Sequence, residues 1–184
     1  MQRIEALNPE GTTGKTKELF DQVQSKLGMV PNMMRTMGNS SAVLEGYLSF
    51  NAALSGSAVG AELGELIALT VANVNGCNYC NAAHSFIGEK LVHIDDELLE
   101  GARTGKVMDK KIQTALSFAR ILVTKRGKVD TEDINLLKEA GFTEGEIAEI
   151  IAHVALNIFT NYFNNAVLVE VDFPEVELVE EAAI

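Results

Sequence analysis

Apolar and polar positions follow a helical period over most of this chain. The first such segment carries Leu19, Phe20, Val23 and Leu27 on one side, and spacings of three and four residues recur up to about residue 167. Capping residues, Gly and Pro divide the pattern into elements. The predicted helices cover residues 16–27, a short stretch from 31, 42–54, 61–74, 77–91, a short stretch from 95, 110–125, 131–140 and 144–167. We therefore expect an all-α fold, a single-domain helical bundle of about eight or nine helices over residues 1–184.

Two segments depart from the ordinary amphipathic pattern. Residues 66–74 contain only two polar side chains, Thr70 and Asn73, so the helix to which they belong is expected to be buried. From about residue 170, acids alternate with Val, Phe and Leu around Pro174. We expect this acidic segment to be an extended tail that packs on a neighbouring subunit.

Composition and charge narrow the functional classes. The chain has 184 residues, of which 47% are hydrophobic and 22% charged, which suits a globular domain with a sizeable core. Its net charge of −11 argues against nucleic acid or an anionic membrane as partner, because both need a basic surface. No apolar run reaches the roughly 18 residues of a membrane span, and residues 1–5 lack a secretory signal pattern. We therefore expect a cytoplasmic protein.

The two cysteines carry the most informative spacing. Successive helical residues turn by about 100°, so on a helix that begins near Cys77 the side chains of Cys80 and His84 share its face. Cys80 and His84 are four residues apart and can touch. A helix N-terminus and a neighbouring imidazolium each stabilise a thiolate. The spacing therefore predicts a reactive thiol site.

Glu65 joins this site by a separate argument. It lies on an alanine-lined face of the buried helix, where a carboxylate is costly without a partner. It precedes Asn75 by roughly 15 Å of helix, and His84 follows Gly76 by roughly 12 Å. If the two helices fold back as a hairpin, Glu65 and His84 lie at about the same level. A carboxylate would then orient an imidazole that takes a proton from a thiol beside a resolving thiol.

These residues resemble a known family. Glu65, Cys77-Asn78-Tyr79-Cys80 and His84 reproduce the E-x11-CxxC-x3-H pattern of alkylhydroperoxidase D-like proteins in the carboxymuconolactone decarboxylase superfamily. The all-helical layout is similar to that fold. Three flanking stretches also resemble its peroxidase-related branch: Leu44-Glu45-Gly46-Tyr47, Asn161-Tyr162-Phe163-Asn164-Asn165 and Asp172-Phe173-Pro174.

The resemblance implies thiol-based reduction of alkyl hydroperoxides without metal, haem, flavin or other cofactor. It implies that Cys80 attacks the peroxide, that Cys77 resolves the product as a disulfide, and that Glu65 and His84 relay protons. Tyr79 stands where the best-known members have His, and it cannot act as a ready base near neutral pH. A thiol or lipoyl-type reductant and a homo-oligomer, trimer or hexamer, are also implied.

The residues alone leave the attacking sulfur open. A helix dipole favours Cys77, which lies nearest the helix N-terminus. The contact with His84 and the family resemblance favour Cys80, which we take as the attacking residue.

Other interpretations accompany the redox site. The CxxC pair could be two structural thiols, a redox-sensing or partner-binding switch, or, with His84 and Glu65, a zinc site. A non-redox, decarboxylase-like enzyme of the same superfamily is a further alternative. Within the motif, Tyr79 is interpreted as pocket lining or as a hydroxyl donor. Outside the motif, His153 is interpreted as a core histidine or as one that reaches the site. The cluster of Met29, Met33, Met34 and Met37 serves packing or forms a substrate wall, and Asn161, Asn164 and Asn165 are interpreted as links between helices.

Overall fold

The structure, a computed structural model, describes residues 1–179. Within that range there are nine α-helices, one π-helical turn and no strand, which confirms the all-α prediction. The elements are α1 (Gly14–Leu27), α2 (Asn32–Met37), α3 (Ser41–Leu54), α4 (Gly60–Val74), α5 (Asn78–Ile87), η1 (Gly88–Val92), α6 (Asp96–Thr104), α7 (Lys110–Thr124), α8 (Thr131–Glu139) and α9 (Glu144–Val167).

The helix ends follow their capping residues. The Ser40 side chain accepts the N–H of Val43 at the start of α3, and Thr143 and Glu146 form the predicted capping box of α9. Asp130 caps α8, because its carboxylate accepts the N–H of the third helical position. One predicted helix is divided in the structure. The helix predicted over 77–91 is α5 followed by the wider turn of η1.

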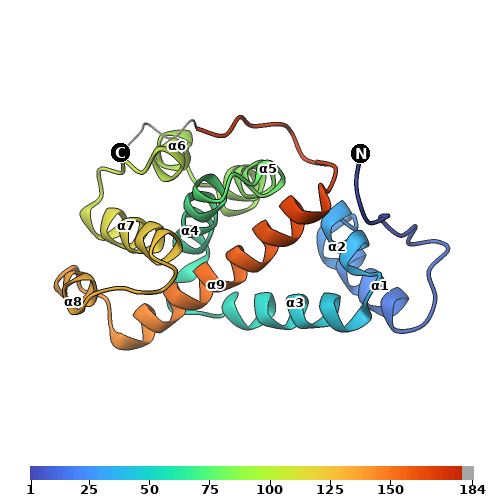
Figure 1. Cartoon of the computed structure of the whole chain (residues 1–184), viewed down its shortest axis with the longest axis horizontal. Coiled ribbons are helices and arrows are strands. Elements are labelled where there is room, and N and C mark those ends of the chain that lie inside the picture. Colours follow the sequence, from blue (N-terminus) through green and yellow to red (C-terminus); the bar gives the residue numbers. More distant parts are fainter. Residues whose placement is uncertain (180–184) are drawn as a thin grey trace.

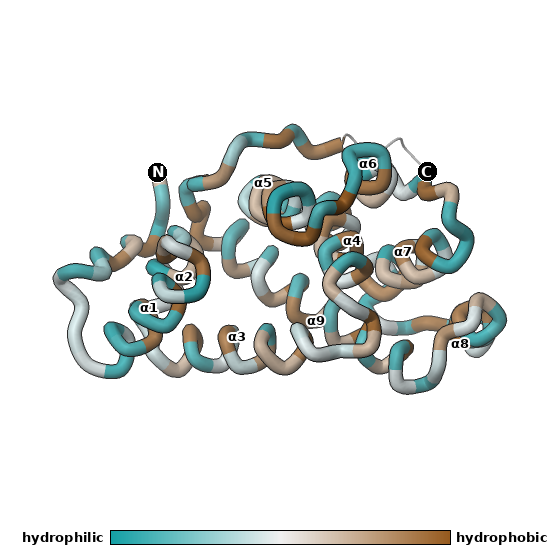
Figure 2. Tube along the Cα trace, turned by 180° about the vertical axis from the view of Figure 1, so that it is seen from behind, coloured by the Kyte–Doolittle hydropathy of each residue, from teal (hydrophilic) through white to brown (hydrophobic). Residues whose placement is uncertain are grey.

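The buried helix α4 lies at the centre of the arrangement. Residues 66–73 are all buried, as their composition predicts, and α4 contacts α5, α6, α7 and α9. The longest helix, α9, runs diagonally across the molecule and reaches from α8 to α2 (Figure 1). Hydrophobic segments gather where α4, α5 and α9 meet, whereas α1 presents more hydrophilic ones (Figure 2). One core cluster therefore surrounds α4, and a second lies between α2, α5 and the end of α9.

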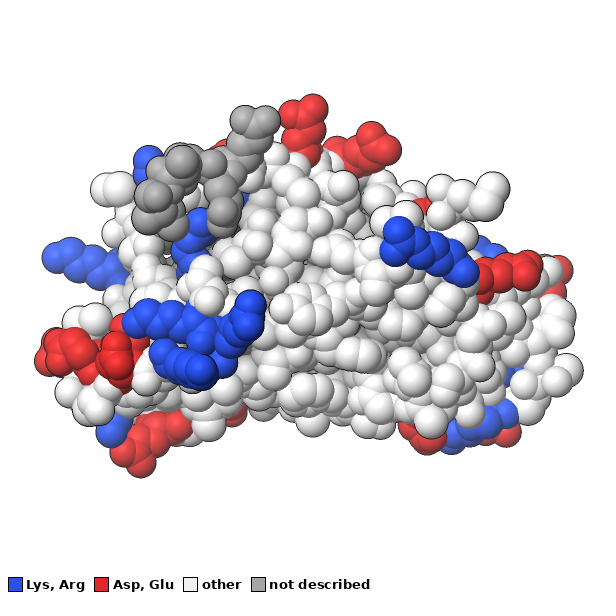
Figure 3. Space-filling model, in the orientation of Figure 1, with Lys and Arg blue, Asp and Glu red and all other residues white. Residues whose placement is uncertain are grey.

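A face of α9 carries apolar side chains that this chain leaves uncovered. Its exposed positions recur every three or four residues, and they are Ala148, Ile151, Ala155, Phe159, Tyr162 and Ala166. Val43 and Phe50 of the neighbouring helix α3 are exposed as well. Charged side chains stand mainly toward the ends and edges of this view, and its middle is largely free of them (Figure 3). Among the described residues, no helix combines the length and apolar character that a membrane span requires.

The acidic tail is extended up to residue 179, as predicted, and it packs on its own chain. Asn81 Nδ2 donates to the carbonyls of Val176 and Glu177 at 2.9 and 3.1 Å. The N–H of Val179 donates to Asn73 Oδ1 at 3.1 Å, and Asn73 in turn donates to Asn81. The tail docks on α4 and α5 because buried amides of both helices supply partners for its backbone. Packing on a neighbouring subunit stays a prediction. Residues 180–184 lie outside the described part.

Candidate active site

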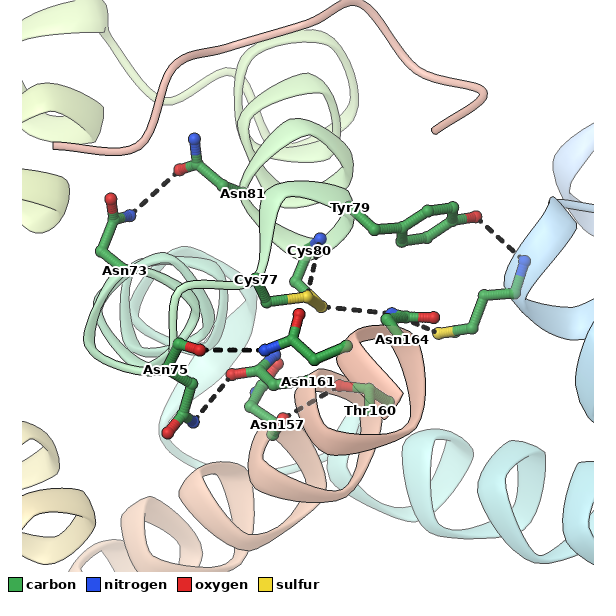
Figure 4. Close-up of a disulfide and its surroundings, with 12 residues drawn as sticks. Asn73, Asn75, Cys77, Tyr79, Cys80, Asn81, Asn157, Thr160, Asn161 and Asn164 are labelled. Carbon is green, nitrogen blue, oxygen red and sulfur yellow. Dashed lines mark hydrogen bonds between the residues drawn. A yellow bond between two sulfur atoms is a disulfide. The ribbon is translucent and has the colours of Figure 1, made fainter. Parts of the chain in front are cut away.

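The two cysteines form a disulfide at the start of α5. Their Cα atoms are 5.3 Å apart, and the two residues are 0% and 2% exposed. Cys77 is the N-cap of α5, and its sulfur accepts the backbone N–H of Cys80 at 3.2 Å. The side chain of Asn164 donates to the Cys80 sulfur, also at 3.2 Å (Figure 4). Each sulfur therefore has one N–H donor, from a helix N-terminus for Cys77 and from α9 for Cys80.

Glu65 and His84 meet as the hairpin argument predicted. His84 Nδ1 lies 2.7 Å from Glu65 Oε2, and both side chains are about four-fifths buried. An ionised carboxylate only accepts hydrogen bonds, so Nδ1 carries the proton of this contact. When the imidazole is neutral, Nε2 is then its basic nitrogen. Since His84 lies one turn beyond Cys80 on α5, this pair belongs to the same helix face as the disulfide.

His153 extends the polar cluster around Glu65. Its Nε2 lies 3.2 Å from Ser57 Oγ, and its ring packs on Gly64, where a Cβ would come within 3.0 Å of the ring. Burial lowers the pKa of His153, and the charges of Glu65 and Glu149 oppose that shift. His153 thus lies beside Gly64, the residue before Glu65, and it contacts Ser57 rather than a cysteine.

Tyr47 of α3 lies close enough to Glu65 to respond to its charge. Burial, and after it the Glu65 carboxylate, raises the pKa of the Tyr47 phenol. Tyr47 belongs to one of the flanking stretches of the family resemblance, but no pattern in the sequence indicates that it lies near Glu65. Glu65 therefore lies within reach of side chains from α3, α5 and α9.

Tyr79 points away from the disulfide. Its hydroxyl accepts the backbone N–H of Met33 at 3.2 Å (Figure 4), and its ring packs against Phe173 of the tail with ring centroids 5.8 Å apart. Burial raises the pKa of the Tyr79 phenol, and the nearby Asp172 carboxylate raises it further. The group is neutral at physiological pH, so it links α5 to α2 and the tail and does not serve as a base.

Buried amides connect α9 to the turn between α4 and α5. Asn75 donates to Asn161 Oδ1 at 3.0 Å, and Asn165 donates to the Asn75 carbonyl at 2.9 Å (Figure 4). These contacts confirm that Asn161 and Asn165 link helices. Asn161 Nδ2 and Asn164 Oδ1 are buried and have no hydrogen-bond partner within residues 1–179. Asn164 differs from the other two because it contacts sulfur, a role that sequence reasoning missed.

The methionine cluster lies beside the same site. Met33, Met34 and Met37 are buried in the cluster that also holds Cys77, Cys80 and Tyr79, whereas Met29 is exposed. Met33 Sδ is 3.3 Å from Asn164 Nδ2. Across α5, a cavity of about 260 Å³ is lined by the tail and by Asn78 and Ala82. The disulfide end of α5 therefore packs against the methionines of α2, and the tail lines a cavity beside the same helix.

The donor geometry gives no support to a zinc site. Within the described range, no three His, Cys, Asp or Glu side chains are grouped as metal ligands would be. Cys77 and Cys80 are bonded to each other, and Glu65 engages His84.

Comparison with known proteins identifies the fold. No family model and no curated protein sequence matches the chain. Among solved structures, it is similar to an uncharacterized peroxidase-related protein from Silicibacter sp. TM1040, with a TM-score of 0.81 and 23% identity over 92% of this chain and 91% of that one. It is equally similar to the alkylhydroperoxidase AhpD core of Ralstonia eutropha JMP134, an uncharacterized peroxidase-related protein, with a TM-score of 0.81 and 22% identity over 93% and 92% of the two chains.

A third neighbour shows that this fold also carries other named activities. The debrominase Bmp8 has a TM-score of 0.74 and 23% identity over 86% of each chain, and a variant of it is known in complex with 2,3,4-tribromopyrrole. The class defined by fold and site is therefore an all-helical protein with a CxxC pair at a helix start. The chain has, in particular, the fold of the alkylhydroperoxidase D core, which confirms the resemblance at the level of the fold.

Proposed function

We propose that this protein is a thiol-dependent peroxidase, also able to reduce disulfides, that uses Cys77 and Cys80 as its redox pair. The observation that carries the proposal is the Cys77–Cys80 disulfide, with the hydrogen-bonded Glu65–His84 pair one turn further along the same helix face. Such a dithiol gives up two electrons when its disulfide forms and takes up two when the disulfide is reduced. The reacting unit is the whole chain as one domain, with no bound cofactor.

The chemistry balances with these groups alone. The Cys80 thiolate attacks the terminal oxygen of an alkyl hydroperoxide, the S–O bond forms, and the O–O bond breaks. The alkoxide leaves with the bonding pair and takes a proton to become the alcohol. The Cys77 thiol then attacks the sulfenic sulfur, the disulfide forms, and water leaves. An external thiol or lipoyl-type dithiol reduces the disulfide.

Glu65 and His84 serve as the proton relay in this proposal. Glu65 holds the Nδ1 proton of His84, so Nε2 is left to take the thiol proton and to return it to the leaving oxygen. Tyr79 contributes by position: it holds Met33 of α2 against α5.

The decisive experiment is consumption of cumene hydroperoxide by chelator-treated protein, with dithiothreitol and with dihydrolipoamide. We expect turnover by the wild type, none by Cys80→Ser, and, when the reductant is left out, at most one equivalent of peroxide consumed by Cys77→Ser. Both free thiols should disappear when the reduced wild type meets peroxide. Full activity of Cys80→Ser would exclude the proposal, and debromination of 2,3,4-tribromopyrrole in place of peroxide turnover would redirect it.

Two alternatives predict other outcomes. A redox-sensing or partner-binding module would oxidise reversibly without turnover and would change its assembly or a partner affinity on oxidation. A decarboxylase-like enzyme would keep its activity in the Cys77→Ser and Cys80→Ser variants. The CxxC disulfide favours the redox proposals.

We also propose that the protein is a cytoplasmic homo-oligomer, a trimer or a hexamer; the uncovered apolar face of α9 supports the assembly part of this proposal. Single exposed apolar residues are ordinary, but a stripe along a whole helix is typical of an interface. Phe159→Glu places a charge in the stripe on α9 and should yield monomers in light scattering. Leu136→Glu, at an exposed apolar position of α8, is the control that should leave the assembly intact.

A further inference from the structure

We propose that Asn164 is a further catalytic residue of this site, whose amide N–H binds the Cys80 sulfur and whose amide oxygen accepts the O–H of the hydroperoxide. The inference rests on the proposed function and adds a group that lies outside the CxxC motif. Asn164 is on α9, 84 residues from Cys80, and its Nδ2 lies 3.2 Å from the reacting sulfur (Figure 4).

The neighbours of Asn164 determine how its amide is oriented. Nδ2 faces Cys80 Sγ at 3.2 Å and Met33 Sδ at 3.3 Å. Disulfide and thioether sulfurs have no proton to donate, so the NH₂ group and not the oxygen faces them. Only 3% of the residue is exposed, so the amide is held by protein groups rather than by bulk water.

Reduction of the disulfide makes the N–H contact stronger. The neutral sulfur of a disulfide is a weak acceptor, whereas a thiolate carries a full charge, and hydrogen bonds to charged acceptors are roughly twice as strong as neutral ones. The amide of Asn164 therefore favours the thiolate of Cys80 over its thiol. The sulfur of Cys77 accepts a backbone N–H of α5, whereas the sulfur of Cys80 accepts the side-chain N–H of Asn164. Of the two cysteines, Asn164 therefore acts on Cys80.

The oxygen of the same amide is an acceptor that the described chain leaves unused. Asn164 Oδ1 is buried without a hydrogen-bond partner in this part of the protein. Buried acceptors are nearly always satisfied, so an unused one next to a reactive atom indicates a ligand that brings a donor. A hydroperoxide carries its only O–H on the terminal oxygen, the atom that the sulfur attacks. An O–H donated to Oδ1 would hold that oxygen beside Cys80.

The same contact remains useful after the attack. The S–O bond forms while the O–O bond breaks, and the terminal oxygen stays on sulfur as the sulfenic acid of Cys80. Its proton can still be donated to Asn164 Oδ1. The alkoxide leaves and is protonated to the alcohol, and the Cys77 thiol then displaces water from the sulfenic acid. No oxidant is needed beyond the hydroperoxide, and an external dithiol restores both thiols.

The first test measures thiolate formation and needs no turnover. In a Cys77→Ser background, the ultraviolet absorbance of the Cys80 thiolate is followed against pH with and without Asn164→Leu. Leu has a similar volume but no hydrogen-bonding group. We expect the thiolate-to-thiol ratio at neutral pH to fall about tenfold or more, a shift of about one pH unit. An unchanged titration would show that Asn164 does not bind the thiolate.

The second test addresses the amide oxygen. The rate of cumene hydroperoxide reduction is compared at a pH where Cys80 is fully ionised in both proteins. A remaining loss in Asn164→Leu supports the contact between Oδ1 and the peroxide. Equal rates under that condition would overturn this part of the inference.

A matched control separates chemistry from packing. Asn157 is on the same helix and equally buried, but its amide donates to the carbonyl of His153 in its own helix. Asn157→Leu should leave the thiolate titration and the rate at full ionisation unchanged. If Asn164→Leu does not fold, Asn164→Ala takes its place, with thermal unfolding reported for every variant.

The two proposals can fail separately. If the wild type consumes no peroxide, the proposed function fails, while the thiolate titration still decides whether Asn164 binds Cys80. If the wild type consumes peroxide and Asn164→Leu equals it at every pH, only this inference fails.

Discussion

His84 and Glu65, 19 residues apart in the sequence, are joined by a 2.7 Å hydrogen bond between α5 and α4. The contact determines which imidazole nitrogen carries the proton. It also places a negative charge beside the helix that holds both cysteines.

Glu65→Gln should therefore slow peroxide reduction without unfolding the protein. An amide can accept the same hydrogen bond, but it lacks the charge that stabilises the imidazolium. We expect a loss of about 10²-fold in rate, the usual contribution of a general base. Stability should fall by about 1 kcal/mol, because a hydrogen bond to a charged group contributes about that much more than a neutral one. The exposed Glu62, one turn earlier on α4, provides the control Glu62→Gln; equal losses in both variants would contradict the relay.

Tyr79→Phe should lower stability and leave chemistry nearly intact. The change removes the acceptor of the buried Met33 N–H at the start of α2, which costs about 1–3 kcal/mol in the free energy of unfolding. The peroxide rate should change little, because burial and Asp172 keep the phenol protonated at neutral pH. Urea unfolding and the peroxide assay test the two statements, with the exposed Tyr162→Phe as control. A large loss of rate at unchanged stability would mean that the hydroxyl takes part in the reaction.

Phe173→Ala should make the disulfide easier to reduce. Phe173 of the tail packs on Tyr79 and Phe86 of α5 with ring centroids 5.8 Å apart in both pairs, and both cysteines are almost fully buried. Loss of the ring should loosen the tail and raise the rate of dithiothreitol reduction several-fold. Free thiols released with time are the measurement. Glu175→Ala, a change at an exposed position of the same tail, is the control and should be reduced at the wild-type rate. A wild-type rate for Phe173→Ala as well would show that the tail does not restrict access of dithiothreitol to the disulfide.

Stability should fall as the pH drops below about 6.5 because of His153. Burial lowers the pKa of His153 below its ordinary value, so the unfolded chain binds its proton at a higher pH than the folded chain does. The stabilisation is therefore present above the ordinary pKa and is lost as the pH falls toward the folded one. Urea unfolding between about pH 7.5 and pH 5 should show a shallower slope for His153→Gln than for the wild type. The exposed His93→Gln should retain the wild-type slope, and parallel curves for all three proteins would contradict the assignment.

Local spacing was enough to predict the helices and part of the site. The period of 3.6 residues places Cys77, Cys80 and His84 on one face, whatever surrounds the helix. The Asn75-Gly76 turn is short, so rise per residue alone brings Glu65 level with His84. These relationships depend on neighbouring helices with little chain between them, and the structure confirms them.

The sequence by itself therefore determined the all-α class, the closeness of Cys77 to Cys80, and the pairing of Glu65 with His84, because each follows from helix geometry over a few turns. Only the tertiary structure decided that Asn164 donates to Cys80 and that the tail lies on α5. It also turned the Tyr79 hydroxyl toward Met33. The residues in these contacts are 46 to 95 positions apart in the sequence. The packing of α2, α9 and the tail brings them together, and no local period specifies such contacts.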